Sequence, residues 1–443
     1  MWELFSYGVI HLWLEMAGIQ NIGQNTVAIL KWQSGIPELI LPENSDKMLT
    51  LEVDEYLEGL KTKGLLTADT QSIWIQSELR SLNSHEGTAP FPGASLIKIA
   101  TSLAALETWG AQHQFETLIS ITGPITDGIL QGDLVINGGS DPYFVWEEAI
   151  ALGNAIQKWG INQVRGNLVM VGNFWMNNRY NNVVTGKLLQ EGINSATWSR
   201  NVRSIYKRMP AGTLMPKVAI AGSVISQKSV SHKIPIIRHK SLPLVHILKT
   251  MNVESNNDLA ETLAKKLGGA KVVQRKAAWS AGVPEAEIKL VNGSGLGVEN
   301  KISPRAATAM FVAIQRYLQT SPWVIADLFP VSGYDTGTLT DQSRTIPQGA
   351  VVKTGTLNDV VALTGVFPTR EHGLVWFTTI NRSPYWEETR VEQDRFLQQL
   401  VDRWGATTPP RAIIPKINGD RLGLGDSKRN HVLQNIKSEE SSE

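Results

Sequence analysis

The 443-residue chain has helical and strand-like patterns of apolar residues in two parts, separated by a segment of different character. Apolar residues recur at helical spacing over residues 51–64, and residues 72–79 alternate as a strand does. The run "SLIKIATSLAALETW" predicts a helix that ends at Gly110. From about 115 to 235, short β-like runs are separated by Gly and Asn, which predicts a strand-rich unit.

Helical patterns return at "LPLVHILKTM", "NDLAETLAKKLGG" and "PRAATAMFVAIQRYLQ", and three strand patterns follow between residues 350 and 381. The last segment is polar and poor in aromatic residues, which is typical of disorder. We therefore expect one unit interrupted by another. The predicted parts are an N-terminal extension (1–48), one helix-and-strand domain (49–115 and 236–412), a β-rich inserted domain (116–235) and a disordered tail (413–443).

The first 20 residues are apolar but carry Glu3, His11 and Glu15, with no Lys or Arg before the apolar part. A secretory signal needs a positively charged start. A transmembrane helix needs about 20 apolar residues with few or no charges. We interpret this segment as an amphipathic docking helix, with a degraded or mis-started signal as the alternative. The sequence thus shows no clean signal peptide.

Composition excludes several classes of chemistry. Hydrophobic residues make up 42% of the chain and the net charge is +1, so a sizeable core is expected and charge alone indicates no polyanionic partner. There is no cysteine, which excludes disulfides, thiolate metal sites and a cysteine nucleophile. The eight histidines show no H-E-x-x-H spacing, and neither a P-loop nor G-x-G-x-x-G occurs. No metal or cofactor is therefore predicted.

The helix that follows the Pro-Gly turn at 92–93 begins with a hydroxyl and an amine, Ser95 and Lys98. Residues three apart project from the same face of a helix. A serine hydroxyl becomes a nucleophile when a neighbouring base removes its proton, and burial lowers the pKa of a lysine toward that role. The helix N-terminus adds donors near developing negative charge. Ser95 and Lys98 are candidates for nucleophile and base; a capping serine followed by a snorkelling lysine is the alternative.

Two further motifs lie downstream. Ser255 and Asn257 occur in "ESNNDLAETLA", where helix capping by the serine is the alternative interpretation. Lys353, Thr354 and Gly355 end a predicted strand. They can offer an ammonium and a hydroxyl to a carboxylate, while the glycine leaves room for a substrate backbone at the strand edge. A merely polar strand end is the alternative here.

In this order, S-x-x-K, S-x-N and K-T-G form the signature of penicillin-recognising serine enzymes. The stretches "GDLVINGGSDPYF", "VNGSGLG" and "FPVSGYDTGTL" narrow the family. Over residues 65–385 the chain resembles the D-alanyl-D-alanine carboxypeptidase/endopeptidase family, the class C low-molecular-mass penicillin-binding proteins. The resemblance implies an α/β (α+β) core of the transpeptidase/β-lactamase type, with an antiparallel sheet flanked by helices. Members of the family often carry two extra domains between the first two motifs, and we expect one here.

The resemblance also implies roles for residues at matching positions. Ser95 is expected to be the acylated nucleophile and Lys98 its base. Ser255 would relay a proton to the leaving amine, and Asn257 would hold the substrate amide and orient Lys98. Ser294 lies in a family motif to which we assign no chemical role.

The third motif is expected to bind substrate. Lys353 and Thr354 would bind the terminal carboxylate of the peptide, with Gly355 and Thr356 completing the binding strand. The backbone N–H groups of Ser95 and Thr356 would form the oxyanion hole.

The function that follows is a serine D-Ala-D-Ala carboxypeptidase, endopeptidase or both, acting on peptidoglycan stem peptides and inhibited covalently by β-lactams. The resemblance implies a location in the cell envelope or periplasm. A serine β-lactamase is the nearest alternative, although no water-activating carboxylate is identified. A catalytically idle peptidoglycan or β-lactam binder is the other alternative, which the intact Ser95 and Lys98 disfavour.

Charge is segregated along the chain, because no Asp or Glu occurs between Glu191 and Glu254. A solvated face balanced by its neighbours is one interpretation. The sharper hypothesis is a basic surface over residues 200–249 that holds anionic wall polymer or membrane. Nucleic acid is not the expected partner, since no aromatic residues interleave the charge. The basic residues are Arg200, Arg203, Lys207, Arg208, Lys217, Lys228, Lys233, Arg238, Lys240 and Lys249.

Overall fold

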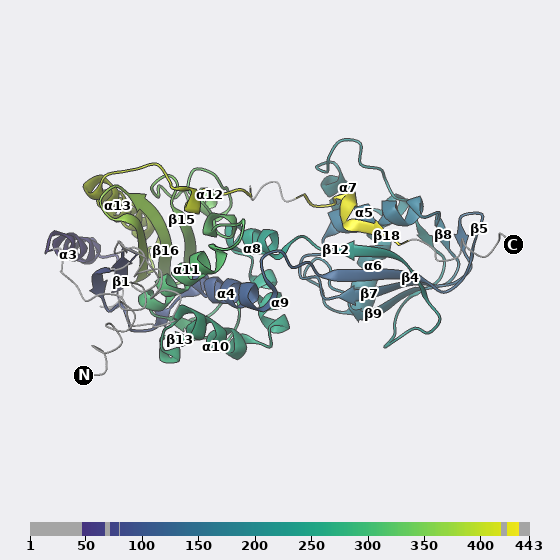
Figure 1. Cartoon of the computed structure of the whole chain (residues 1–443), viewed down its shortest axis with the longest axis horizontal. Coiled ribbons are helices and arrows are strands. Elements are labelled where there is room, and N and C mark those ends of the chain that lie inside the picture. The colour runs from purple at the N-terminus through teal and green to yellow at the C-terminus, as the bar shows by residue number, and fades with distance from the viewer. Residues whose placement is uncertain (1–46, 67–70, 79, 418–422, 434–443) are drawn as a thin grey trace, which may run out of the picture.

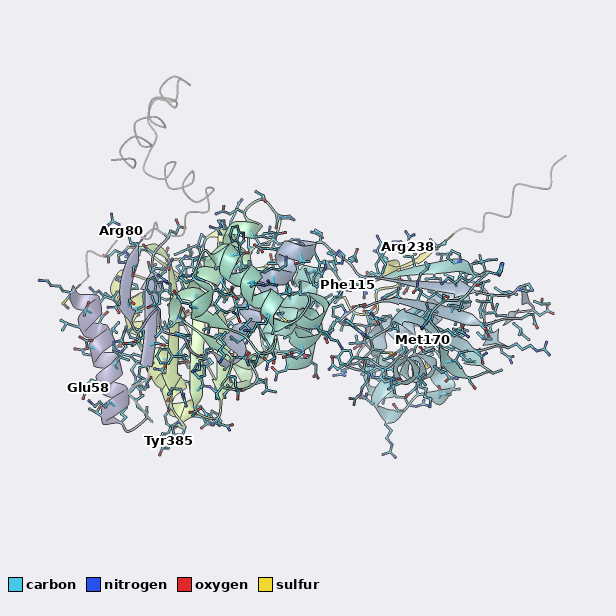
Figure 2. All side chains as sticks on the ribbon, turned by 90° about the horizontal axis from the view of Figure 1, so that it is seen from below. Glu58, Arg80, Phe115, Met170, Arg238 and Tyr385 are labelled. Atoms are coloured by element: carbon cyan, nitrogen blue, oxygen red, sulfur yellow. The ribbon has the colours of Figure 1, made fainter. Side chains whose placement is uncertain are left out.

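The computed structural model describes residues 47–66, 71–78, 80–417 and 423–433, arranged in two lobes (Figure 1). One lobe contains both ends of the helix-and-strand unit, and the other contains the insert. Figure 2 shows Phe115 where the chain passes between the lobes and Met170 within the second lobe. The predicted N-terminal docking helix lies outside the described residues. Among the described helices, none has the length and apolar character needed to cross a membrane.

The first lobe is built on a five-stranded antiparallel sheet in the order β15-β16-β17-β1-β2. Its central strands are buried on both faces. On β16, Leu363 and Phe367 face one core while Ala362 and Val366 face the other. This alternation follows from the two-residue period of a strand. The strands are β15 (Val351–Leu357), β16 (Val360–Thr369), β17 (Gly373–Arg382), β1 (Gln71–Gln76) and β2 (Ser81–His85).

Helices cover both faces of this sheet (Figure 1). Helices α3 (Lys47–Thr62) and α13 (Trp386–Trp404) pack on one face. A larger group covers the other face, and a small three-stranded sheet lies beside it. This group contains α4 (Ile97–Trp109), α8 (Leu244–Val253), α9 (Asn257–Lys266), α10 (Ala270–Ala281) and α11 (Pro304–Leu318), with β3 (Phe91–Pro92), β13 (Ile288–Lys289) and β14 (Lys301–Ile302) in the small sheet. Short turns are η1 (Ala94–Leu96), η3 (Glu285–Glu287), η4 (Ile325–Asp327), α12 (Thr338–Asp341) and η5 (Arg411–Ile413).

The second lobe has a six-stranded sheet in the order β11-β9-β7-β4-β12-β18 and a smaller sheet in the order β10-β8-β6-β5. Three helices, which the β-like runs did not predict, share its core. The helices are α5 (Trp146–Lys158), α6 (Asn182–Gly192) and α7 (Arg200–Tyr206), with the turn η2 (Ser195–Thr197). The strands are β4 (Glu116–Ile121), β5 (Ile125–Thr126), β6 (Ile129–Leu130), β7 (Leu134–Gly139), β8 (Gln163–Val164), β9 (Leu168–Asn173), β10 (Ala219–Ile220), β11 (Val224–Ser226) and β12 (Ile234–Lys240).

The predicted boundary at residue 235 needs correction. Strand β12 pairs antiparallel with β4 as far as Lys240 opposite Glu116, so the insert continues through residue 240. Its apolar residues pack into the core of the second lobe, as Ile236 and Ile237 show. A strand of this kind has no local signal that marks which of two sheets it joins.

The predicted disordered tail is wrong for residues 413–417 and 423–433. The amides of Lys416 and Ile417 donate to Asp327 Oδ1 in the first lobe. After η6 (Ser427–Arg429), strand β18 (Asn430–Val432) pairs with β12 in the second lobe. Arg429 also binds the buried Glu148 of α5. Ile413 and Ile417 are also buried in the core of the first lobe. These isolated apolar residues, and the polar and backbone contacts beside them, form no periodic pattern that a hydrophobicity analysis detects.

Candidate active site

Ser95 lies in the turn η1, directly before α4. Its neighbours Ala94 and Leu96 are fully buried, whereas Ser95 is partly exposed. Ala94 has a φ of 46°, a left-handed conformation that is uncommon for alanine. Such conformations cost free energy and persist where the surrounding packing enforces them. The apolar sequence on both sides of Ser95 thus anchors the turn and leaves its hydroxyl accessible.

Lys98 is fully buried, and its Nζ contacts three oxygen atoms. These are Ser95 Oγ at 2.9 Å, Asn257 Oδ1 at 2.7 Å and the backbone oxygen of Ser294 at 2.8 Å. The amide and backbone oxygens can only accept hydrogen bonds. A neutral amine has two N–H groups and one lone pair. When both N–H groups are taken by Asn257 and Ser294, the lone pair is directed at the hydroxyl of Ser95.

Burial also favours the neutral amine, because it lowers the pKa of Lys98 to about 7, while the charge of Glu261 opposes this shift. The side chain therefore does not snorkel to solvent. Neither η1 nor α4 has a side-chain hydrogen bond at its N-cap, so Ser95 is not a capping residue. Both parts of the alternative interpretation of this motif are wrong.

Ser255 lies in the short turn that joins α8 to α9, and Asn257 is the first residue of α9. Ser255 has a φ of 51°, again in the left-handed region. The N-cap of α9 is Asn256, whose side chain accepts from the amide of Leu259 at 2.9 Å. The capping interpretation of Ser255 is therefore wrong. The turn instead directs Asn257 to Lys98, and Ser255 to the third motif.

Lys353 on β15 is fully buried, and its Nζ donates to Ser255 Oγ at 3.0 Å and to the backbone oxygen of Thr354 at 2.8 Å. Burial, assisted by the charge of Lys98, holds the pKa of Lys353 well below its ordinary value. Lys353, in the third motif, thus contacts Ser255 of the second motif. The two lysines face two serine hydroxyls, Ser95 and Ser255.

Gly355 has a packing role in addition to the one expected. A Cβ atom at this position would lie 2.9 Å from the backbone oxygen of Gly93 and 3.2 Å from the nitrogen of Ser95. The missing side chain therefore lets β15 pack against the nucleophile's own turn. β15 is the edge strand of its sheet. Its outer edge pairs with the segment around Val331 only as far as Val352, so the part that begins at Lys353 has no strand partner there among the described residues. Thr356, the next residue along the strand, is partly exposed.

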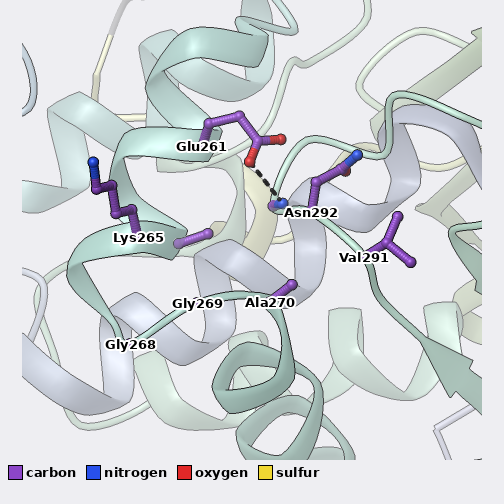
Figure 3. Close-up of a pocket in the computed structure, with 9 residues that line it drawn as sticks. Glu261, Lys265, Gly268, Gly269, Ala270, Val291 and Asn292 are labelled. Carbon is purple, nitrogen blue, oxygen red and sulfur yellow. Dashed lines mark hydrogen bonds between the residues drawn. The ribbon is translucent and has the colours of Figure 1, made fainter.

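The sequence analysis did not identify Glu261, on α9 one turn after Asn257. Its carboxylate accepts from the amide of Gly293 at 3.2 Å, the hydrogen bond drawn in Figure 3. It also accepts from the amide of Ser294 at 2.9 Å. It thereby orients the peptide whose next carbonyl, that of Ser294, accepts from Lys98. The i, i+4 spacing from Asn257 on one helix face was the available signal.

The loop that contains Ser294 passes very close to the nucleophile's turn. A Cβ atom at Gly295, whose φ is 85°, would lie 1.8 Å from the backbone oxygen of Ala94. The glycine-rich sequence is thus required for this approach. The structure assigns Ser294 a place in the site through its backbone oxygen, since its side chain is buried.

The five residues form two hydrogen-bonded groups, Ser95–Lys98–Asn257 and Ser255–Lys353. The groups are neighbours, because Ser255 and Asn257 are two positions apart and the charge of Lys98 acts on Lys353. Within the described part of the chain, no group of three or more His, Asp or Glu residues is arranged to hold a metal ion. The arrangement suits acyl transfer by an activated serine. The individual roles remain predictions.

Comparison with known proteins identifies the family. The model of the D-Ala-D-Ala carboxypeptidase 3 (S13) family matches residues 60–182 and 183–404. The chain belongs to this family. It is therefore a member of a family of serine D-Ala-D-Ala carboxypeptidases, as the three motifs predicted.

Two curated relatives are named as carboxypeptidases. The D-alanyl-D-alanine carboxypeptidase of Actinomadura sp. (strain R39) is 24% identical over 494 aligned positions, which cover 87% of this chain and 88% of that protein. Carboxypeptidase DacB of Mycolicibacterium smegmatis is 27% identical over 190 positions, which cover 39% of this chain and 38% of the relative.

Solved structures confirm the predicted fold class. The penicillin G-acylated predatory endopeptidase Bd3459 of Bdellovibrio bacteriovorus has a TM-score of 0.70 at 20% identity, covering 82% of this chain and 99% of that one. Penicillin-binding protein 4 (dacB) of Haemophilus influenzae has a TM-score of 0.58 at 16% identity, covering 79% and 99%. At these identities the likeness concerns the fold.

Proposed function

We propose that this protein hydrolyses the D-Ala-D-Ala bond of peptidoglycan stem peptides through an acyl-enzyme on Ser95. The observation that carries the proposal is the buried Lys98, whose three oxygen contacts include Ser95 Oγ at 2.9 Å. A lysine with a pKa of about 7 is a competent base near neutral pH. The family assignment supplies the class of substrate.

In the acylation step, Ser95 Oγ bonds to the penultimate carbonyl carbon and its proton passes to Lys98. The backbone N–H groups of Ser95 and Thr356 stabilise the oxyanion of the tetrahedral intermediate. The C–N bond then breaks, and the leaving amine takes a proton relayed by Ser255, which replaces it with the proton that Lys98 removed from Ser95; Ser255 is itself hydrogen-bonded to Lys353. In the second step water attacks the ester, neutral Lys98 takes a proton from that water, and Lys98 returns this proton to Ser95 Oγ as the ester bond breaks. One peptide bond and one water molecule thus yield D-Ala and the shortened peptide.

The substrate peptide is expected to lie along the free edge of β15, with its terminal carboxylate near Thr354. Together with Thr354, Lys353 is proposed to bind this carboxylate. Lys353 also orders Ser255, because its Nζ donates to Ser255 Oγ and to the backbone oxygen of Thr354. The same site admits an amide whose leaving group belongs to a cross-linked stem, which is the endopeptidase reaction. Named relatives of both kinds exist, a carboxypeptidase and an endopeptidase.

A β-lactam resembles the D-Ala-D-Ala amide and its carboxylate, so we expect covalent inhibition at Ser95. The Bdellovibrio structure shows its own enzyme acylated by penicillin G. Peptidoglycan as the proposed substrate, together with the family, supports a site of action in the cell envelope.

Intact-mass spectrometry after penicillin G exposure, followed over hours, tests this proposal. We expect an adduct that is retained for hours and absent from Ser95→Ala. Rapid loss of the adduct would indicate a serine β-lactamase. If the adduct persists but the protein releases no detectable D-Ala from peptides, the protein is a catalytically idle binder.

The structure narrows the basic surface that we infer on the insert. Lys249 does not belong to it, because it is buried against Asp335. Arg238 and Lys240 both pair with Glu116. Five exposed residues on α7 and the following loop form no ion pair with any described residue: Arg200, Arg203, Lys207, Arg208 and Lys217.

These five residues, which we call the α7 basic surface, are the proposed contact with anionic wall polymer or membrane. Co-sedimentation with isolated sacculi across a salt series tests this contact, because exposed charges are screened beyond about 8 Å at 0.15 M ionic strength. Reversing Arg203, Lys207 and Arg208 to Glu is expected to abolish binding and to leave penicillin acylation intact. Salt-independent binding, or binding unchanged by the triple variant, would exclude this role.

A further inference from the structure

Arg390 on α13 is a buried cation beside the binding strand. Its side chain is 7% exposed, and Nη2 donates to Thr356 Oγ1 at 2.8 Å. The guanidinium lies 4.6 Å from the centre of the Trp386 ring. Its Nε atom is buried without a hydrogen-bond partner among the described residues. This arrangement leaves part of the donor capacity of Arg390 unused.

The charge of Arg390 is also unbalanced locally. It forms no ion pair with any residue that the structure describes, although a buried charge is costly unless it is paired. Asp394, one turn further along α13, is already bound by Arg344. Glu387, the other acidic neighbour, is exposed on the preceding turn. An arginine remains protonated throughout the physiological pH range, so this positive charge is permanent.

Arg390 differs in this respect from Lys353, the cation that the third motif suggests for a substrate carboxylate. Lys353 is fully buried and directed at Ser255, and its pKa lies well below the ordinary value. Lys353 and Gly355 face the nucleophile's turn. Thr354 and Thr356 point to the opposite face of β15, because side chains alternate along a strand. Arg390 reaches the strand on that second face.

The hydrogen bond to Thr356 fixes the direction of the threonine hydroxyl. Oγ1 accepts from Arg390 and therefore has its own O–H available to donate elsewhere. Thr356 is partly exposed. A hydroxyl that accepts from a cation is a stronger donor to an anion, because hydrogen bonds in a chain polarise one another.

We propose that Arg390 is a positioning residue for substrate recognition: through the hydroxyl of Thr356 it directs a donor, and a permanent positive charge, at the terminal α-carboxylate of the peptide. This inference rests on the proposed acyl transfer at Ser95. It predicts that Arg390 discriminates between acyl donors that carry this carboxylate and those that lack it. A purely structural brace between α13 and β15 would not discriminate.

The experiment compares acylation of the full chain by penicillin G and by penicillin G methyl ester, followed by intact mass. Arg390→Gln is expected to slow acylation by the free acid by about 10- to 100-fold, the range for a lost hydrogen bond to a charged group. Its effect on the ester is expected to stay within about threefold. Arg390→Lys keeps the charge and should recover part of the rate with the acid.

The matched control is Arg382→Gln, at the end of β17. Arg382 pairs with Asp359 and does not contact the threonines of β15. This variant should change neither rate. Thr356→Val should reproduce the acid-selective loss, and the double variant should lose little more than either single one, because the two residues act in series.

An equal loss with acid and ester would overturn the proposal and assign Arg390 a structural role. Unchanged rates in Arg390→Gln would overturn it too. If Arg390→Gln does not fold, Arg390→Lys and Thr356→Val still provide the acid-to-ester ratio. Failure of the wild-type protein to be acylated by either compound would refute the proposed function itself, which separates the two outcomes.

Discussion

The pH dependence of acylation gives access to the base, and Glu261→Gln is the informative perturbation. At pH 7, a lysine with the ordinary pKa of 10.5 is deprotonated in about one molecule in 3,000. With the pKa of Lys98 at about 7, half of the molecules hold the neutral amine. Burial thus raises the population of the active base by roughly three orders of magnitude.

The acylation rate should therefore rise with pH through about 7 and level off above it. At pH 5 it should be about 100-fold below the plateau, since the neutral fraction falls tenfold per pH unit. The negative charge of Glu261 raises the pKa of Lys98, so its removal should move the rise to lower pH. The plateau should fall as well, because the single carbonyl oxygen of a glutamine side chain cannot replace both carboxylate oxygens, each of which binds one amide.

The assay is stopped-flow acylation with a chromogenic β-lactam between pH 5 and pH 9. Glu299→Gln is the control. This exposed carboxylate lies on the loop whose amides Glu261 binds, and its removal should leave the pH profile unchanged. A flat profile in the wild-type protein would contradict the role of Lys98 as base. A rise that moves to higher pH in Glu261→Gln would contradict the electrostatic argument.

Three further predictions concern a close backbone packing contact and two buried ion pairs. Gly295→Ala should abolish acylation and lower the free energy of unfolding by at least about 1–3 kcal/mol, because the added Cβ would collide with the Ala94 carbonyl. The control Gly59→Ala lies in open space on α3 and should be neutral or stabilising. Equal shifts of the melting temperature in the two variants would refute the predicted collision. Lys249→Met should cost about 3–5 kcal/mol in urea unfolding, because it leaves Asp335 buried without its ammonium partner; a loss below about 1 kcal/mol would show that the pair is dispensable. Arg429→Ala should make the second lobe more sensitive to protease while acylation of Ser95 persists, because Arg429 binds the buried Glu148. The control is Lys428→Ala, at an exposed residue. Equal protease sensitivity of the two variants would argue against anchoring through Glu148.

Much of the first lobe could be predicted because its elements have regular patterns. The helix that follows Ser95 and the three strands that contain and follow Lys353 lie where their apolar spacing indicated. The motifs identified the main site residues because each combines a chemical group with a fixed local spacing. The geometry also decided against the capping interpretations of Ser95 and Ser255, since each hydroxyl is hydrogen-bonded to a buried lysine.

The residues that sequence reasoning missed act through contacts between distant segments. Glu261 binds backbone amides 32 and 33 positions away, and Arg390 meets Thr356 across 34 positions. A single carboxylate or guanidinium on an amphipathic helix is interpreted as a solvated charge until the facing loop is known. The strand β18 was missed for a related reason, since its partner strand lies far earlier in the chain, as the 191-residue separation of His239 and Asn430 shows.

The most direct measurement of the central claim is the release of D-Ala from a stem peptide ending in D-Ala-D-Ala, with acid-quenched samples analysed by mass spectrometry. The wild-type protein should release one D-Ala per peptide and show a peptidyl ester on Ser95. Ser95→Ala should do neither, and Lys98→Met should retain the fold and lose both. Release of D-Ala by Ser95→Ala, or an ester mapped to another residue, would contradict the account.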